Sequence, residues 1–160
     1  MSGKKGFTIV EMLVILGVTA LLSAMLILYS RSGERQVALF REQAKIMSFF
    51  FQAKSLSLAT VAEIGPLNTC GYGLHLDSPD TYLLFKDLAA DCMLSDHKYS
   101  GGAELTQSST LPPGIVFDTL GASDILFVPP DPTVYITPVA EETTISLKTS
   151  DGLGSVIIKV

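Results

Sequence analysis

The sequence predicts an α+β protein in which a long N-terminal α-helix, membrane-spanning in its first half, packs on a C-terminal head of antiparallel β-sheet. Two observations predict the helix: the run from Phe7 to Tyr29 is apolar with a single charge, and no proline interrupts the chain before Pro66. A third predicts the sheet, because beyond Ile64 short extended runs alternate with proline and glycine turns. With 160 residues, the chain has room for one modest domain besides the anchor.

Changes in composition divide the chain into four parts. Residues 1–6 form a short leader containing Lys4 and Lys5, 7–29 an apolar helix, 30–62 an amphipathic continuation of that helix, and 63–160 the β-rich head. A helix over residues 7–29 would be ~35 Å long, enough to cross a hydrocarbon core of about 30 Å with some tilt. We therefore expect residues 7–29 to span a membrane.

The continuation of the helix carries an apolar stripe at spacings of four and three. Helical periodicity of this kind predicts a buried face, so we expect the stripe to pack on the head, and we interpret Phe49 to Phe51 as core. The stripe consists of Phe40, Ala44, Met47, Phe51, Ser55, Leu58 and Ala62.

The head is predicted from its extended runs and the turns between them. The alternation of Ile145 and Leu147 with Ser146 and Lys148 predicts a strand with one solvated face, and the turn at 151–152 predicts a hairpin. Residues 87–90 are a weaker candidate for a helical turn. The expected strands are 73–76, 82–86, 114–117, 125–128, 133–137, 143–149 and 155–160.

Charge is distributed unevenly along the chain. Residues 31–54 hold five basic and two acidic side chains, whereas residues 63–160 hold four basic and thirteen acidic ones, a net charge of −9. A surface of this sign repels the phosphate backbone. Nucleic acid is therefore not an expected partner of the head.

Cys70 and Cys92 are the only cysteines in the sequence. They lie in the part expected outside the cytosol, which favours one disulfide over two buried thiols or a metal pair. Neither histidine stands at zinc-ligand spacing from them. Closing this loop would stabilise the fold by ~3 kcal/mol on the chain-entropy model.

No pattern in the head predicts an enzyme, a metal site or a cofactor. His75 and His97 belong to no metal-ligand or triad motif. Gly71-x-Gly73 is too short for a phosphate loop and precedes a strand. The acidic residues Asp87, Asp91 and Asp96 lack the spacing of a calcium loop, so we interpret them as a solvated acidic loop.

Glu11 conflicts with an ordinary membrane anchor. A carboxylate in an apolar span costs ~2.5 kcal/mol or more on insertion scales. A secretory signal peptide does not explain it either, because the apolar run is longer than a usual signal core and continues into a helical stripe. Glu11 is therefore either a tolerated acid near the membrane interface or a residue with a role in assembly, and the residues around it, described next, favour the assembly role.

The segment Lys4-Lys5-Gly6-Phe7-Thr8-Ile9-Val10-Glu11-Met12-Leu13-Val14 resembles the cleavage and assembly motif of type IV pilins and type II secretion pseudopilins. The resemblance implies a pilin-like fold. It also implies that prepilin peptidase cuts after Gly6 and methylates the new amino terminus at Phe7, and that Glu11 pairs with such an amine during assembly. The implied partners are prepilin peptidase, other pilin or pseudopilin subunits, the inner-membrane assembly platform and the lipid bilayer.

The same resemblance implies a location and a function. The chain would be a single-pass protein of the cytoplasmic (inner) membrane, with its N-terminus in the cytoplasm and its head outside, and would then enter an extracytoplasmic filament. Gly17, Ala20 and Ala24 offer a surface for close helix contact. Alternatives are a binding component at the filament tip, such as an adhesin or a DNA-uptake receptor, and a membrane-anchored enzyme.

Within this family, the head is similar to H-type minor pseudopilins. The similarity lies in three segments, 82–85, 111–117 and 125–130, and in the run at 154–160. The absence of a proline before Pro66 disfavours a major pilin, because many major pilins carry one in the membrane segment. The sequence does not distinguish a pilus from a secretion pseudopilus or a DNA-uptake filament.

Overall fold

The structure is a computed structural model that describes residues 8–59, 67–130 and 133–160. It divides into two compact units, Met1–Val37 and Ala38–Val160, and helix α1 contributes to both. The elements are α1 (Ile9–Ala59), β1 (Asn68–Asp77), β2 (Thr81–Ala89), the 3₁₀ helix η1 (Cys92–Leu94), β3 (Leu105–Thr110), β4 (Ile115–Leu120), β5 (Asp124–Val128), β6 (Thr133–Thr137), β7 (Thr144–Thr149) and β8 (Ser155–Lys159).

The first unit consists, in its described part, of the beginning of α1. The segment Ile9–Ile27 has a mean hydropathy of 2.4 and is long and apolar enough to cross a membrane. All of its side chains are exposed. The predicted apolar N-terminal helix is therefore confirmed.

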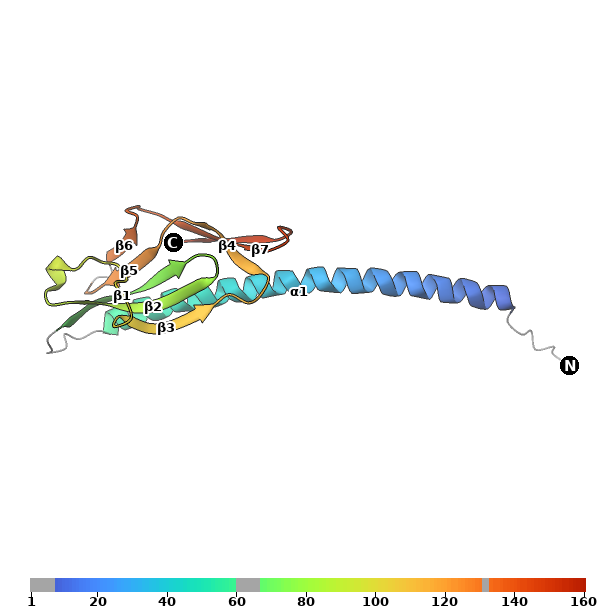
Figure 1. The fold of residues 1–160 in the computed structure, drawn as a ribbon, viewed down its shortest axis with the longest axis horizontal. Coiled ribbons are helices and arrows are strands. Elements are labelled where there is room, and N and C mark those ends of the chain that lie inside the picture. The colour runs from blue at the N-terminus through green and yellow to red at the C-terminus, as the bar shows by residue number, and fades with distance from the viewer. Residues whose placement is uncertain (1–7, 60–66, 131–132) are drawn as a thin grey trace. The chain divides into compact units, whose positions relative to one another are not determined.

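The second unit contains two antiparallel sheets (Figure 1). Sheet A has the strand order β3-β2-β1-β5-β6, and sheet B has the order β4-β7-β8. Every neighbouring pair is antiparallel, which confirms the predicted α+β class with an antiparallel head. The predicted hairpin is present between β7 and β8, where Gly152 adopts a φ of 71° that favours glycine.

The core of this unit forms where α1 from Ala38 onward meets both sheets. Leu39, Ile46, Phe50 and Ala53 of the helix are buried in one cluster with residues of the strands. The strand residues of this cluster include Leu74, Tyr82, Leu84, Ile125, Ile145 and Leu147. As predicted, Ile145 and Leu147 of β7 are buried, and they alternate with the more exposed Thr144, Ser146 and Lys148.

The helix face predicted to pack on the head is not the one that does so. Phe40, Ala44, Phe51, Ser55 and Leu58 are exposed and Met47 is half-buried, whereas Ala62 lies outside the described residues. The buried face instead includes Glu42 and Ser57. Because Glu42 and Ser57 are polar, the inner face does not stand out as an apolar stripe in the sequence. In addition, Phe49 and Phe50 are buried whereas Phe51 is exposed, so aromatic side chains occur on both faces.

Two local predictions in the head were also wrong. Residues 87–89 belong to β2 rather than to a helical turn, and the short helix is η1, a few residues further on. Strand β3 was not predicted, because Leu105 is its single apolar residue and five hydroxyl or amide residues follow. As an edge strand exposed on both faces, β3 needs no apolar alternation.

Gly71 and Gly73 lie on β1 where it passes close to β5. A Cβ at Gly71 would lie 2.5 Å from the carbonyl oxygen of Phe127, and one at Gly73 would lie 2.6 Å from that of Ile125. The pair of glycines therefore permits close strand packing and does not form a phosphate loop.

Candidate functional site

The start of helix α1 is the first part of the candidate site. The hydroxyl of Thr8 accepts a hydrogen bond from the backbone N–H of Glu11 at 3.3 Å, and the carbonyl of Thr8 accepts one from Met12 at 3.1 Å. Thr8 is thus the N-cap, and Glu11 occupies the third helical position, which is the spacing of the Thr-x-x-Glu capping-box motif. The spacing Thr8-x-x-Glu11 is the sequence signal that marks this helix N-terminus.

Glu11 is the one charged side chain between Thr8 and Ile27, and its position in the first helical turn is electrostatically favourable. A carboxylate there faces the positive end of the helix dipole, worth typically 0.3–1 kcal/mol. The other predicted residues of this part, Lys4, Lys5, Gly6 and Phe7, lie outside the described residues.

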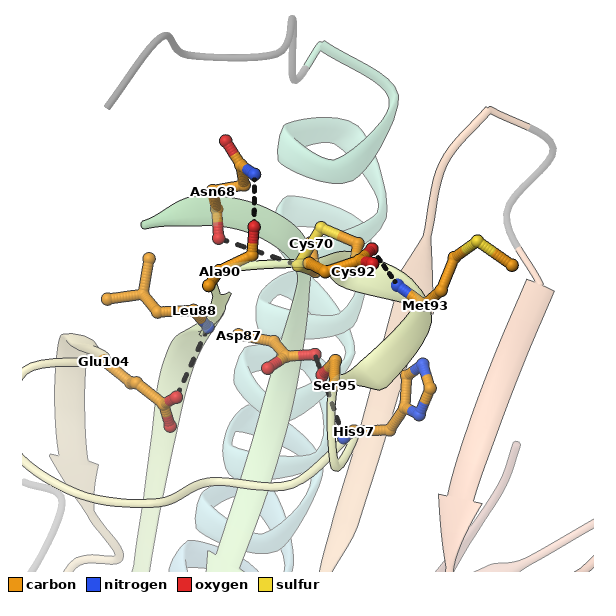
Figure 2. Close-up of a disulfide and its surroundings, with 11 residues drawn as sticks. Asn68, Cys70, Asp87, Leu88, Ala90, Cys92, Met93, Ser95, His97 and Glu104 are labelled. Atoms are coloured by element: carbon orange, nitrogen blue, oxygen red, sulfur yellow. Dashed lines mark hydrogen bonds between the residues drawn. A yellow bond between two sulfur atoms is a disulfide. The ribbon is translucent and has the colours of Figure 1, made fainter. Parts of the chain in front are cut away.

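The second part of the site is the connection between β2 and β3. Cys70 on β1 forms a disulfide with Cys92 at the start of η1, with a Cα–Cα distance of 5.2 Å (Figure 2). This confirms the predicted disulfide and leaves the chain without a free cysteine.

Two buried carboxylates brace the same connection from inside (Figure 2). Asp87 accepts a hydrogen bond from the hydroxyl of Ser95. Glu104 accepts one from the N–H of Leu88 at 3.3 Å and another from the N–H of Ser100 at 2.6 Å. Because these groups come from both ends of the connection, the carboxylates hold its backbone in one arrangement.

Burial raises the pKa of Asp87 above its ordinary value of 3.8. The hydrogen bond from Ser95 and the proximity of His97 act in the opposite direction, and nearby Asp96 adds to the rise. Loss of water around a carboxylate disfavours its charged form, and this is the dominant cause here.

A third buried carboxylate, Asp124, joins the connection to sheet A. It accepts hydrogen bonds from the N–H of Tyr99 at 3.1 Å and from the hydroxyl of Ser123 at 2.7 Å, and it lies 2.7 Å from Nδ1 of His75. A histidine oriented by an aspartate can serve as a general base when a nucleophile is hydrogen-bonded to its other nitrogen. Through these contacts Asp124 ties His75 of β1 and Tyr99 of the connection to β5.

The prediction of a solvated acidic loop was wrong for Asp87, which is buried, whereas Asp91 and Asp96 are exposed. The other predicted polar residues belong to the connection. His97 stacks on Tyr135 of β6 with ring centroids 4.0 Å apart. Asp91 caps η1 by accepting from the N–H of Met93, and Asp96 accepts from Lys98 and Ser100. Within the described residues, no group of three or more His, Cys, Asp or Glu side chains could hold a metal ion.

A shallow groove of about 370 Å³ lies on the outer face of sheet B. A register shift in β4 after Phe117 turns both Asp118 and Thr119 outward, and the ammonium group of Lys148 lies 2.6 Å from the carboxylate of Asp118. The groove offers hydroxyls and charges but neither a histidine nor a thiol. Its lining residues are Asp118, Thr119, Thr144, Ser146, Ser155, Ile157 and Lys159.

The structure defines a class of protein: an apolar N-terminal helix, long enough to cross a membrane, continues into an antiparallel β-sheet head. The family model of the prokaryotic N-terminal methylation motif matches residues 1–27. This match supports the type IV pilin and pseudopilin family, whose members are structural subunits. No curated protein and no solved structure matches the chain.

Proposed function

We propose that the chain is a prepilin that prepilin peptidase cuts after Gly6 and methylates at Phe7, and that the product is assembled into a type IV pilus or a type II secretion pseudopilus. The methylation motif at residues 1–27, followed by an apolar helix with Glu11 as its one charge, carries this proposal. The leader is then cytoplasmic, the span lies in the inner membrane, and the head is outside before the subunit enters the filament.

The chemistry of Glu11 supports an assembly role. Cleavage after Gly6 creates an amine at Phe7, next to the N-cap Thr8 and about one helical turn from Glu11. A positive amine at a helix N-terminus opposes the dipole, and a lone carboxylate in lipid is costly. Pairing the amine of one subunit with Glu11 of a neighbour removes both penalties and fixes the register of the two helices.

The exposed stripe on the second half of α1 supports packing between subunits. The described members of this outer stripe, Phe40, Ala44, Met47, Phe51, Ser55 and Leu58, are mainly exposed and lie on one side of the helix. In a filament, the helices of neighbouring subunits and the inner-membrane assembly platform are the partners that would contact α1. Burial of three large side chains would favour such contacts by several kcal/mol, at roughly 1.5–3 kcal/mol each.

Within this family we propose a minor subunit with an H-type head. Two observations favour it: α1 lacks a proline, and a tight turn precedes β4, where Ile115 donates to the carbonyl of Pro112 and Gly114 adopts a φ of 90°. The alternative roles, a tip adhesin, a DNA-uptake receptor or a membrane-anchored enzyme, have no comparable support. The net charge of −9 on residues 63–160 weighs against nucleic acid as a partner.

Intact-mass measurement of the protein from cells with prepilin peptidase tests the processing step. We expect the mass to fall by that of residues 1–6 and to rise by one methyl group. Cells lacking the peptidase provide the control and should yield the full chain. An uncut leader in the presence of the peptidase would refute the proposal.

Substitution Glu11→Gln tests the assembly role. We expect normal membrane insertion and a loss of filament incorporation, measured in sheared filament fractions. Glu34→Gln is the matched control, because Glu34 is an exposed acid on the same helix outside the apolar segment. If Glu11→Gln assembles as well as the control, the electrostatic role of Glu11 is wrong.

A further inference from the structure

We propose that, before assembly, the outer stripe of α1 docks on the anionic lipid surface of the membrane that anchors the chain. This inference goes beyond the proposed function and rests on one part of it, the membrane anchoring by Ile9–Ile27.

In the part of α1 between Ala38 and Ala59, the acidic side chain is buried and two basic side chains are exposed. The one acid of this segment, Glu42, is buried against the head, where it receives a hydrogen bond from Tyr82. Two basic residues, Arg41 and Lys54, are exposed and flank the outer stripe on either side. The exposed charge of the segment is therefore positive, although the rest of the head is strongly acidic.

The large apolar side chains of the outer stripe lie on the helix surface between Arg41 and Lys54. Side chains of this kind insert at the boundary between lipid headgroups and acyl chains. Phe40, Phe51 and Leu58 are 62%, 66% and 54% exposed, although they are large. A helix with aromatic and aliphatic residues on one face and flanking basic residues binds anionic membrane surfaces, and its long basic side chains extend to the headgroups. The acidic surfaces of the head would be repelled by the same lipid, which selects the helix face for contact.

The chain brings this face close to the membrane. Only ten residues separate Ile27 from Ala38, about 16 Å of helix, so the local concentration of lipid is high. Docking requires a change of direction in this interval. Ser32-Gly33 provides a position for it, because sharp helix bends occur at Gly/Ser pairs and glycine weakens a helix by ~1 kcal/mol relative to alanine.

The proposal is tested with the full chain in lipid vesicles, using a fluorophore on a single introduced cysteine. Ala44→Cys places the label on the outer stripe without removing an aromatic side chain. Gln52→Cys is the matched control, because this residue is exposed on a different side of the same helix. The two native cysteines form the disulfide and do not react. The probe is quenching by a lipid-borne quencher in phosphatidylcholine vesicles with and without phosphatidylglycerol.

We expect strong quenching at position 44 and weak quenching at 52, with the difference present only in vesicles that contain phosphatidylglycerol. Lys54→Gln should lower the equilibrium constant for docking of the helix on the anionic vesicle about fivefold. This corresponds to ~1 kcal/mol for one basic side chain near an anionic surface. Lys98→Gln, on the β2–β3 connection, should not change it. Gly33→Ala should also reduce the quenching, and an added Cβ there meets nothing within 4 Å.

Equal quenching at both positions, or equal quenching in neutral and anionic vesicles, would overturn the proposal. A label at position 44 that is shielded from water but not quenched by lipid would assign the stripe to a second copy of the chain and would overturn it as well. None of these results depends on prepilin peptidase or on filaments, so they are independent of leader cleavage and assembly.

Discussion

The two faces of α1 between Ala38 and Ala59 differ in a way that composition does not suggest. The inner face contains Glu42 and Ser57, yet it is buried, whereas the outer face carries Phe40 and Phe51 and is exposed. Ser57 donates a hydrogen bond to the carbonyl of Phe127 at 2.7 Å, and Glu42 lies near both Tyr82 and Lys45. Polar residues at the inner face thus have partners, and apolar residues at the outer face are left for another surface.

The comparison teaches that apolarity alone does not identify the packing face of a helix that has two contact partners. The inner face serves the stability of the head, and the outer face is free for contacts outside it. Substitutions on the two faces should therefore separate stability from assembly, and neighbouring residues of the same type provide matched pairs.

The largest contrast is expected between Phe50→Ala and Phe51→Ala. Phe50 is 6% exposed and Phe51 is 66% exposed. Truncating the buried ring should cost about 3–5 kcal/mol of unfolding free energy, whereas the exposed ring should contribute within about 0.5 kcal/mol. Chemical denaturation of the two variants measures this. Similar losses in both would show that the outer face also packs within the head.

A smaller contrast is expected between Glu42→Ala and Arg41→Ala. Removal of Glu42 leaves the buried hydroxyl of Tyr82 without its acceptor and Lys45 without its 3.9 Å ion pair, at a cost of about 1–3 kcal/mol. Arg41 is exposed, so its removal should leave stability nearly unchanged. Thermal unfolding compares the two, and an unaffected Glu42→Ala would show that this buried acid contributes no net stability.

Ser57→Ala and Ser55→Ala form the third pair. The hydroxyl of Ser57 is buried and bonded to Phe127 of β5, while Ser55 is exposed. Loss of the buried hydrogen bond should cost about 1 kcal/mol, and alanine at the exposed site should be neutral or slightly stabilising because it favours helix. Chemical denaturation measures the unfolding free energies of both variants, and an equal change in the two would contradict this prediction.

The smallest effect is expected at Asp87, a buried carboxylate that lies on the sheet rather than the helix. Because its pKa is raised in the fold, Asp87 contributes stability below its ordinary pKa of 3.8 and loses that contribution as pH rises through the raised value. Asp87→Asn keeps an acceptor for Ser95 but cannot ionise.

The variant should therefore be at least as stable as the wild type at neutral pH and should lose less stability between acidic and neutral pH. Melting temperatures across this range, with exposed Asp91→Asn as the control, measure the effect. If Asp87→Asn is less stable at neutral pH, the ionised carboxylate contributes more than its burial costs.

Local signals in the sequence predicted the fold class, the long helix and the strands whose residues alternate. The disulfide was predictable because the chain has only two cysteines. Strand β3 and the packing face of α1 were not, because both depend on which surfaces meet in the folded head. The bracing of the β2–β3 connection by Asp87, Glu104 and Asp124 was also beyond prediction, since the groups that these carboxylates bind become adjacent only when the connection folds onto the sheet.

The two glycines on β1 restrict how this head can vary. At Gly17 and Gly33 of α1, by contrast, an added Cβ meets nothing within 4 Å. At Gly71 and Gly73, any side chain would force β5 away from β1 and would disturb β6, which pairs with β5. Because Gly71 and Gly73 have no Cβ, β5 can pair with β1, and β6 remains attached to the sheet through β5. We therefore expect these two positions to be among the least tolerant of substitution in the head.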